Sequence, residues 1–358
     1  MKEALRQNKD FYKNKRVFVT GHTGFKGAWL CAMLAYLQAN ITGYALKEEK
    51  GSLFEKIHGA NMVAHFEGDI RDYRSLKEAI DRSKPEIVFH LAALAQVKDC
   101  FDDPLKAYST NVMGTVNLLE ALRTSQVKSI VIVTTDKVYE NKGDGAVYTE
   151  DDLLGGSDPY ATSKTSMEYV VKAYRESYFQ NGEKRVGVAT VRASNVLAGG
   201  DHVQTRLIPS ILHAVSQGRE LELRNPHQTR PWQSVLDALN GYLTVGRYIY
   251  INPTEYSEGW NIGPTIDGIR TVSWIVGKVK ESFAGLESRT GIKFDVKESE
   301  TLGLDISKAL KCLDWKPMLS CDNVVKNVVD FYLGQQRGVN ERDLCLRQIK
   351  KFYEESGV

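Results

Sequence analysis

A glycine-rich loop that joins an apolar run to a helical segment is the feature that most constrains the fold of this chain. Arg16–Thr20 is a β-rich apolar run typical of a buried parallel strand, and residues 28–37 have helical periodicity. Gly21, Gly24 and Gly27 lie between them. In dinucleotide-binding folds the first glycine permits a tight turn, the second lets backbone amides approach a pyrophosphate, and the third lets helix and strand pack closely. The loop therefore predicts a dinucleotide site, with the spacing Gly-x-x-Gly-x-x-Gly.

A tyrosine and a lysine four residues apart suggest the chemistry of this site. Tyr160 and Lys164 would project from the same face of a helix, because four residues make about one helical turn. An ammonium beside a phenol favours the phenolate and lowers the phenol pKa. A phenolate can take a hydroxyl proton while hydride leaves the carbinol carbon for a nicotinamide. Surface helices also contain such pairs, so the pair predicts redox chemistry only in combination with the glycine loop.

Strand-like and helix-like segments alternate through the first half of the chain. Beyond the first strand, strands are expected at 41–46, 63–66, 86–90, 129–134 and 185–191, with helices at 73–83, 104–124 and 159–179. This alternation predicts an α/β fold, a Rossmann doubly wound parallel sheet.

The regular alternation fades after about residue 190, which indicates a second, smaller and mixed region. We expect residues 1–192 to form a dinucleotide-binding domain, with a return segment near 232–262. Residues 193–231 and 263–358 are then expected to form a substrate-binding domain.

Length and composition exclude several classes of protein. The 358 residues suit one large or two fused domains, and 42% hydrophobic with 26% charged residues is ordinary for a soluble protein. No run of some 18 apolar residues and no signal-peptide core is present, so a cytoplasmic protein without a membrane span is expected. The net charge of +2 does not favour nucleic-acid binding. The five cysteines and the histidines are dispersed, and we expect no metal site.

Five motifs in a fixed order resemble the extended short-chain dehydrogenase/reductases that act on nucleotide sugars. They are the glycine loop, Asp69-Ile70, Leu91-Ala92-Ala93, Asn111 and Tyr160-x-x-x-Lys164, and the resemblance runs from about Lys13 to about residue 345. Within that group, Asp136-Lys137, Arg206-Leu207-Ile208-Pro209 and Arg230-Pro231-Trp232-Gln233 are similar to the CDP-glucose 4,6-dehydratases. Better-known nucleotide-sugar 4,6-dehydratases carry Asp-Glu where this chain has Asp136-Lys137.

The resemblance implies an NAD site. The implied cofactor-binding residues are Gly21, Thr23, Gly24, Phe25, Gly27, Asp69, Ile70, Leu91, Ala92, Ala93, Asn111, Thr134, Tyr160 and Lys164. NADP stays open, because Lys47 lies where an NAD enzyme usually has an acidic residue, with Glu48 one residue further on. Asp69 has a competing interpretation as the N-cap of the helix that begins at Tyr73.

The resemblance also implies a reaction, the conversion of CDP-glucose to CDP-4-keto-6-deoxyglucose and water. The sugar is oxidised at C4, water is eliminated across C5 and C6, and hydride returns to C6. The implied catalytic residues are Thr135, Asp136, Lys137, Tyr160 and Lys164. Asp136 would donate a proton to the leaving hydroxyl and Lys137 would remove the C5 proton; a purely structural Asp-Lys pair is the alternative.

The resemblance further implies a nucleotide-sugar substrate and a homodimer or a dimer of dimers. The residues expected to bind the substrate are Asn195, Arg206, Arg224 and Arg230. Guanidinium groups bind phosphate oxygens bidentately, although each arginine could equally lie on the solvated surface. The helices expected at 104–124 and 159–179 carry apolar residues on more than one face, and relatives pair these helices across a dimer.

Three alternatives remain open. The family usually has Gln where this chain has Leu94, which leaves a 4,6-dehydratase of a GDP-, dTDP- or UDP-linked sugar possible. A nucleotide-sugar 4-epimerase would need no Asp136-Lys137 pair. A regulator that senses NAD(H) without catalysis would not need Thr135, Asp136, Tyr160 and Lys164 together.

Overall fold

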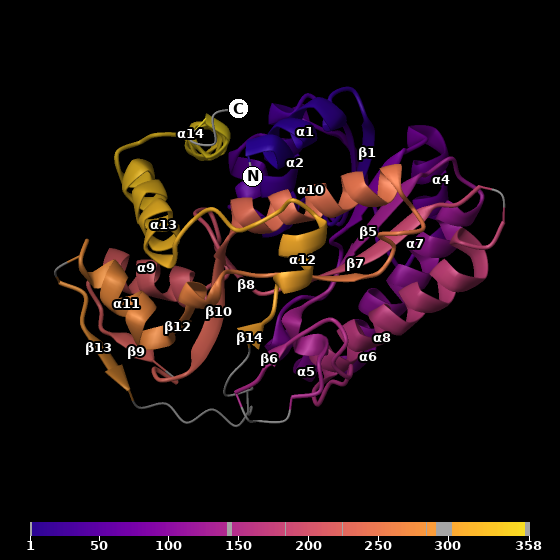
Figure 1. The fold of residues 1–358 in the computed structure, drawn as a ribbon. Helices are drawn as coiled ribbons and strands as arrows, with labels where there is room; N and C mark the ends of the chain where they lie inside the picture. Colours follow the sequence, from indigo (N-terminus) through magenta and orange to yellow (C-terminus); the bar gives the residue numbers. More distant parts are fainter. Residues whose placement is uncertain are drawn as a thin grey trace.

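A parallel seven-stranded sheet forms the centre of the molecule (Figure 1). The computed structural model describes residues 2–141, 145–182, 184–223, 225–283, 285–290 and 303–354. In order across the sheet, the strands are β11 (Gly259–Ile262), β7 (Gly187–Ala193), β5 (Ser129–Val133), β4 (Ile87–His90), β1 (Arg16–Thr20), β2 (Asn40–Ala45) and β3 (Ala64–Glu67). The prediction of a doubly wound parallel sheet is confirmed, and every predicted strand is present within about two residues.

Helices cover both faces of this sheet (Figure 1). One face packs against α1 (Lys2–Tyr12), α2 (Phe25–Tyr36), α10 (Val235–Ile251) and α14 (Glu341–Glu354). The other packs against α4 (Tyr73–Ser83), α7 (Gly114–Arg123) and α8 (Pro159–Tyr174). Because both faces are covered, strands such as β5 are buried along their whole length and read as continuous apolar runs.

Two of the predicted helices are interrupted by π-helical turns. The helix expected at 104–124 consists of α6 (Pro104–Tyr108), a π-helical turn at Ser109–Met113, and α7. The helix expected at 159–179 consists of α8 followed by a π-helical turn at Arg175–Phe179. Turns of this kind occur often at functional sites.

The second part of the molecule has its own small sheets and core. Its larger sheet has the order β12 (Ile269–Thr271), β10 (Thr229–Ser234), β8 (Asn195–Leu197), and β9 (Leu221–Leu223) pairs with β13 (Ser288–Thr290). Its helices include α9 (Leu207–Gln217), α11 (Val272–Lys280) and α13 (Cys321–Gln336). The remaining elements are α3 (Leu53–Lys56), α5 (Val97–Asp102), α12 (Ser307–Cys312), and the paired strands β6 (Val147–Tyr148) and β14 (Gly303–Leu304).

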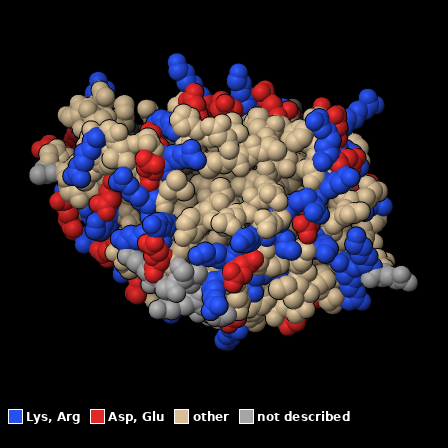
Figure 2. Space-filling model, turned by 90° about the horizontal axis from the view of Figure 1, so that it is seen from above, with Lys and Arg blue, Asp and Glu red and all other residues tan. Residues whose placement is uncertain are grey.

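Charged side chains of both signs are interspersed on the face seen in Figure 2. They surround a broad central area without charged side chains, so the described residues of this face form no continuous basic stripe of the kind that binds nucleic acid. Within the described part of the chain, no helix is both long and apolar enough to cross a membrane. The described residues also contain no group of three or more His, Cys, Asp or Glu side chains placed to hold a metal ion.

Candidate active site

The carboxyl ends of β1, β4 and β5 open on the same edge of the sheet, because these strands are parallel neighbours. The glycine loop follows β1, Leu91–Ala93 follow β4, and Thr134–Lys137 follow β5. The strand order reverses between β1 and β4, and open α/β sheets bind ligands at such a point. The fold therefore brings the predicted cofactor loops and the predicted catalytic residues to one edge.

The three loop glycines differ in what they allow. Gly21 has φ +70°, and a Cβ there would lie 2.6 Å from the backbone nitrogen of Ala92, so a side chain would separate the two loops. A Cβ on Gly27 would lie 2.2 Å from the carbonyl oxygen of Gly21, which blocks the close approach of α2. A Cβ on Gly24 would meet only the Gly21 carbonyl oxygen, at 3.4 Å. Gly24 therefore keeps open space at the N-terminus of α2, where a phosphate would approach.

Asn111 joins the loop after β4 to the helix of the Tyr160–Lys164 pair. Its fully buried side chain accepts a hydrogen bond from the Leu94 amide at 2.8 Å and donates to the Leu94 carbonyl at 3.1 Å. It also donates to the Ser163 hydroxyl at 2.8 Å. Asn111 lies within the first π-helical turn, so that irregular turn carries a residue that organises the site.

Asp69 and Ile70 follow β3 at the same edge. The Asp69 carboxylate accepts from the Arg71 guanidinium at 2.6 and 3.0 Å, and this hydrogen bonding lowers its pKa. The N-cap of α4 is Asp72, which accepts from two backbone amides of the first turn. The competing interpretation of Asp69 as this N-cap is therefore wrong. Ile70 is buried and packs against Gly114, while Thr23 in the glycine loop donates to the Leu46 carbonyl at 3.1 Å.

Helix α8 places Tyr160 and Lys164 one turn apart, as their spacing predicts. The helix begins with Pro159 after the N-cap Asp158, whose carboxylate accepts from the Ala161 amide at 2.9 Å. The buried Lys164 ammonium donates to the Val133 carbonyl at 3.1 Å, so it lies against the end of β5. Burial, and then the charge of nearby Lys26, lower the Lys164 pKa to about 7.

A cavity of about 150 Å³ opens above the end of β5. Its lining combines residues from the glycine loop, from the loops after β4, β5 and β7, and from α8. They are Lys26, Ala95, Val97, Thr134, Thr135, Asp136, Lys137, Tyr160, Ala193, Ser194 and Asn195. The cavity thus brings together Thr134, Thr135, Asp136, Lys137, Tyr160 and Asn195 from the sequence-based candidates.

Burial raises the pKa of both Asp136 and Tyr160. Asp136 is 3% exposed, and burial raises its pKa although Lys137, Thr135, Arg230 and Lys26 each lower it. Its Oδ1 accepts from the Thr135 hydroxyl at 3.0 Å, whereas its Oδ2 is buried and, in the described structure, has no hydrogen-bond partner. Burial also raises the Tyr160 pKa; hydrogen bonding with Thr135 and the charge of Arg206 oppose this rise.

The arginines expected to bind substrate lie in different surroundings. Arg206 precedes α9 and is paired with Asp201 at 3.0 and 3.1 Å. Arg230 is buried on β10, donates to the Thr229 carbonyl at 2.9 Å, and lies close enough to lower the Asp136 pKa. Arg224 lies outside the described residues.

Lys26 and Ser194 belong to the cavity but were not among the sequence-based candidates. Burial, and then the charge of Arg206, lower the Lys26 pKa to about 8. The Ser194 hydroxyl is buried and has no hydrogen-bond partner in the described structure. The one available signal for Lys26 was a cation directly before the third glycine of a phosphate-binding loop. Ser194 follows a buried strand and carries no pattern of its own.

Comparison with known families identifies the class of protein. The profile of the family described as GDP-mannose 4,6 dehydratase matches residues 18–328. The chain belongs to this family of nucleotide-sugar 4,6-dehydratases, which are extended short-chain dehydrogenase/reductases. Among curated proteins, the chain is 40% identical to the CDP-glucose 4,6-dehydratase of Salmonella typhimurium over 351 residues, 96% of this chain and 98% of that protein.

Solved structures share the fold at lower identity. The epimerase Mth375 of Methanothermobacter thermautotrophicus superimposes with a TM-score of 0.79 at 21% identity, covering 94% of this chain and 97% of that one. The dTDP-glucose 4,6-dehydratase of Bacillus anthracis in complex with NAD gives a TM-score of 0.73 at 23% identity, covering 90% and 97%. At these identities the likeness establishes the fold alone.

Proposed function

We propose that this protein is an NAD-dependent CDP-glucose 4,6-dehydratase that forms CDP-4-keto-6-deoxyglucose and water. The near full-length similarity to the Salmonella typhimurium CDP-glucose 4,6-dehydratase supports this substrate. The observation that carries the proposal is the buried Asp136 carboxyl with its unpartnered Oδ2, in one cavity with Tyr160 and Lys137. An epimerase has no leaving hydroxyl to protonate, whereas a dehydratase needs an acid over C6.

The residues present fit a dinucleotide. Gly24 leaves room beside the N-terminus of α2, whose backbone amides and positive dipole end suit a pyrophosphate. Gly21 holds Leu91–Ala93 next to this loop, and Lys164 would donate to the nicotinamide ribose. When bound, NAD+ supplies hydride-accepting and hydride-returning chemistry. We propose NAD rather than NADP, because Glu48 follows Lys47 and could bind the adenosine ribose, and the dTDP-glucose 4,6-dehydratase of Bacillus anthracis is in complex with NAD.

Tyr160 and Thr135 would hold and move the proton at the sugar O4. The Tyr160 phenolate takes the proton of the C4 hydroxyl as the C4–H bond breaks, and Tyr160 must lose this proton before the next turnover. Because burial raises the phenol pKa, the hydrogen bond from Thr135 and the charge of Arg206 are needed to favour the phenolate. Thr135 has one hydroxyl proton, which bonds either Asp136 or the phenolate, so a protonated Asp136 frees it for Tyr160.

Asp136 and Lys137 would carry out the elimination. Once C4 is a ketone, the C5 proton is acidic, and Lys137 removes it in its neutral form. The electron pair of the C5–H bond forms the C5–C6 double bond, and the C6 hydroxyl leaves as water with the proton of Asp136. The raised Asp136 pKa suits a carboxyl that must carry a proton.

The outer parts of the substrate and the assembly follow from the surroundings of the cavity. Arg206, Arg230 and Asn195, with Arg224, would bind the CDP group. We propose a cytoplasmic homodimer or dimer of dimers. In support, large apolar side chains are exposed on α6, α8 and the π-helical turns; they are Leu105, Tyr108, Met113, Tyr169 and Tyr178.

Mass spectrometry of the purified protein with NAD+ and CDP-, dTDP-, GDP- and UDP-hexoses tests this proposal. The expected result is the loss of one water, 18 Da, from CDP-glucose. Loss from another nucleotide sugar would move the substrate, and a new isomer without mass change would establish an epimerase. In deuterium oxide, the Lys137→Ala variant should not exchange the C5 proton; if exchange continues, Lys137 is not the base.

A further inference from the structure

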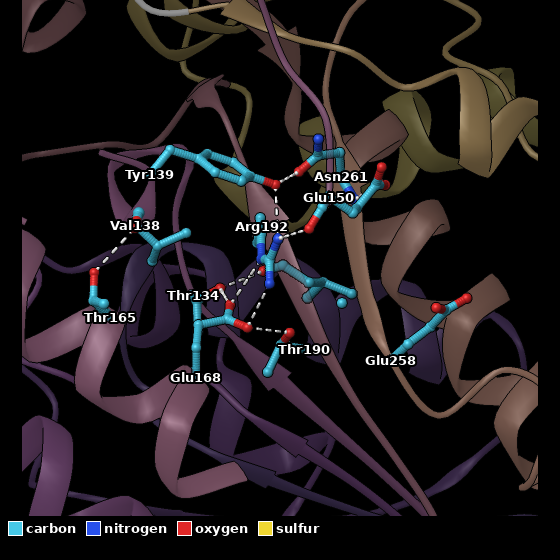
Figure 3. Close-up of polar contacts among 12 residues, drawn as sticks. Thr134, Val138, Tyr139, Glu150, Thr165, Glu168, Thr190, Arg192, Glu258 and Asn261 are labelled. Carbon is cyan, nitrogen blue, oxygen red and sulfur yellow. Dashed lines mark hydrogen bonds and ion pairs between the residues drawn. The ribbon is translucent and has the colours of Figure 1, made fainter. Parts of the chain in front are cut away.

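A buried ion pair joins α8 to β7 (Figure 3). Glu168 of α8 and Arg192 of β7 approach to 3.1 Å, and both side chains are less than 10% exposed. Glu168 Oε1 accepts from the Thr134 hydroxyl at 2.6 Å and from Arg192 Nε at 3.2 Å. Its Oε2 accepts from the Thr190 hydroxyl at 2.7 Å and from Arg192 Nη2. Every oxygen of this carboxylate is therefore bonded.

The guanidinium continues the network away from α8 (Figure 3). Arg192 Nη1 donates to the Tyr139 hydroxyl at 2.8 Å and to the Glu150 carbonyl at 3.2 Å. Tyr139 in turn donates to Asn261 of β11 at 2.6 Å. Asn261 donates to the carbonyls of Tyr148 and Asp305, both at 2.9 Å. The network thus connects α8, β5, β7 and β11 with the segments that carry β6 and β14.

The Glu168 end of the ion pair contacts two elements that carry active-site residues. Thr134, the partner of Glu168, is followed directly by Thr135 and Asp136. Glu168 lies one helical turn after Lys164 on the same helix, and its charge acts on the Lys164 ammonium. The bond between Thr134 and Glu168 therefore fixes the end of β5 against α8, which sets the separation of Asp136 from Tyr160.

We propose that the Glu168–Arg192 pair is a positioning unit for the dehydration, which acts through Thr134 to hold Thr135 and Asp136 in place opposite Tyr160 and Lys164. This inference rests on the proposed function. A buried ion pair is weak evidence for stability, since apolar side chains of similar size often stabilise as well or better. What such side chains cannot supply is the directed set of hydrogen bonds that ties β5 to α8.

Two threonines provide a matched pair of variants. Thr134 and Thr190 are both buried, both lie on the parallel sheet or at its end, and each donates one hydroxyl to Glu168 at nearly the same distance. Thr134 alone precedes the catalytic residues. Replacing either threonine by valine keeps the shape and removes its hydrogen bond to Glu168; Thr134 also loses a longer contact of its hydroxyl with the Val191 carbonyl at 3.4 Å. Thr134→Val and Thr190→Val should therefore lower Tm by similar amounts, about 2–4 °C.

The two variants should differ in turnover. Thr134→Val is expected to lower kcat for CDP-glucose at least about tenfold with little change in KM, because misplaced groups lose catalysis rather than substrate binding. Thr190→Val should stay within about twofold of the unsubstituted protein, and Thr134→Ser, which restores the hydroxyl, should recover most of kcat. Equal kcat losses in Thr134→Val and Thr190→Val, or none in either, overturn the positioning role. An unsubstituted protein that dehydrates no nucleotide sugar overturns the proposed function, and the positioning role with it.

Discussion

Two buried carboxyl groups lie close to the end of β5, and their hydrogen-bonding surroundings differ. Glu168 of α8 accepts hydrogen bonds on both oxygens from Thr134, Thr190 and Arg192. Asp136, on the cavity side, accepts one hydrogen bond from Thr135 and has an unpartnered Oδ2 in the described structure. Both oxygens of Glu168 thus accept hydrogen bonds from the protein, whereas in the described structure only one oxygen of Asp136 does.

This difference indicates a structural role for Glu168 and a functional role for Asp136. Buried polar atoms in proteins nearly always have partners, so an unpartnered carboxyl oxygen beside a cavity indicates a group intended for a ligand. Glu168 contacts its cation Arg192 directly. The cations around Asp136 do not prevent burial from raising its pKa. The protein therefore holds one carboxyl in an ion pair and raises the pKa of the other; Thr134, which bonds Glu168, precedes Asp136 by two residues.

The largest expected effect comes from Asp136→Asn. The amide keeps the shape but cannot donate an acidic proton, so kcat should fall about 10²–10⁴-fold. Stability should move the other way. The folded state raises the Asp136 pKa, so the ionised form opposes folding, and this cost is present at neutral pH but absent below the unfolded pKa.

The effect of Asp136→Asn on the unfolding free energy should depend on pH. Urea unfolding should show Asp136→Asn to be more stable than the unsubstituted protein at pH 8, with the gain shrinking toward pH 4. A loss of stability at pH 8 would mean that Asp136 is a satisfied structural residue like Glu168. Retained turnover would remove it from the chemistry altogether.

Glu168→Gln should produce the second largest effect, and mainly on stability. It leaves the Arg192 guanidinium buried without a counter-charge, and breaking a buried pair in this way costs about 3–5 kcal/mol of unfolding free energy. The double variant Glu168→Gln/Arg192→Met, which removes both charges, should recover much of that loss. If Glu168→Gln lowered the unfolding free energy by less than about 1 kcal/mol in urea, Arg192 would not need Glu168 as its counter-charge.

The sequence predicted those parts of the site that depend on short, local sequence patterns. Strand, glycine turn and helix have distinct periodicities, so the sheet and the loop at Gly21 were predictable, and so was the Tyr160–Lys164 pair. The Asp136-Lys137 dipeptide was found through family resemblance, and the structure adds that Asp136 is buried and that its Oδ2 has no hydrogen-bond partner among the described residues.

Other features depend on contacts between distant segments and leave no local pattern. Glu168 and Arg192 look like ordinary charged residues until α8 packs on β7. Helix α1 was not predicted, although its residues are amphipathic; the contacts that hold it in place, such as the bonds of buried Asn8 to Asn240 and Thr244 of α10, join segments more than 200 residues apart. The N-cap of α4 was assigned to Asp69 as an alternative, but Asp72 lies closer to the helix start.

Lys26→Met should have the smallest effect, a shift in pH dependence of about one unit or less. The charge of Lys26 lowers the pKa of Lys164 and of Asp136, so its removal should raise both. Activity that requires the Lys164 ammonium and a protonated Asp136 should then persist to higher pH. Glu168→Gln should do the opposite, because the Glu168 charge raises the Lys164 pKa, now about 7.

Profiles of kcat against pH for the two variants therefore test whether Lys26 and Glu168 both act on Lys164. Lys77→Met is the matched control, because Lys77 is paired with Asp81 on α4 and its loss removes one positive charge outside the cavity. Its profile should coincide with that of the unsubstituted protein. If the pH profiles of Lys26→Met and Glu168→Gln shift in the same direction, the loss of activity at high pH is caused by a group other than Lys164. Opposite shifts would mean that the cavity cation and the core carboxylate jointly set the protonation of Lys164.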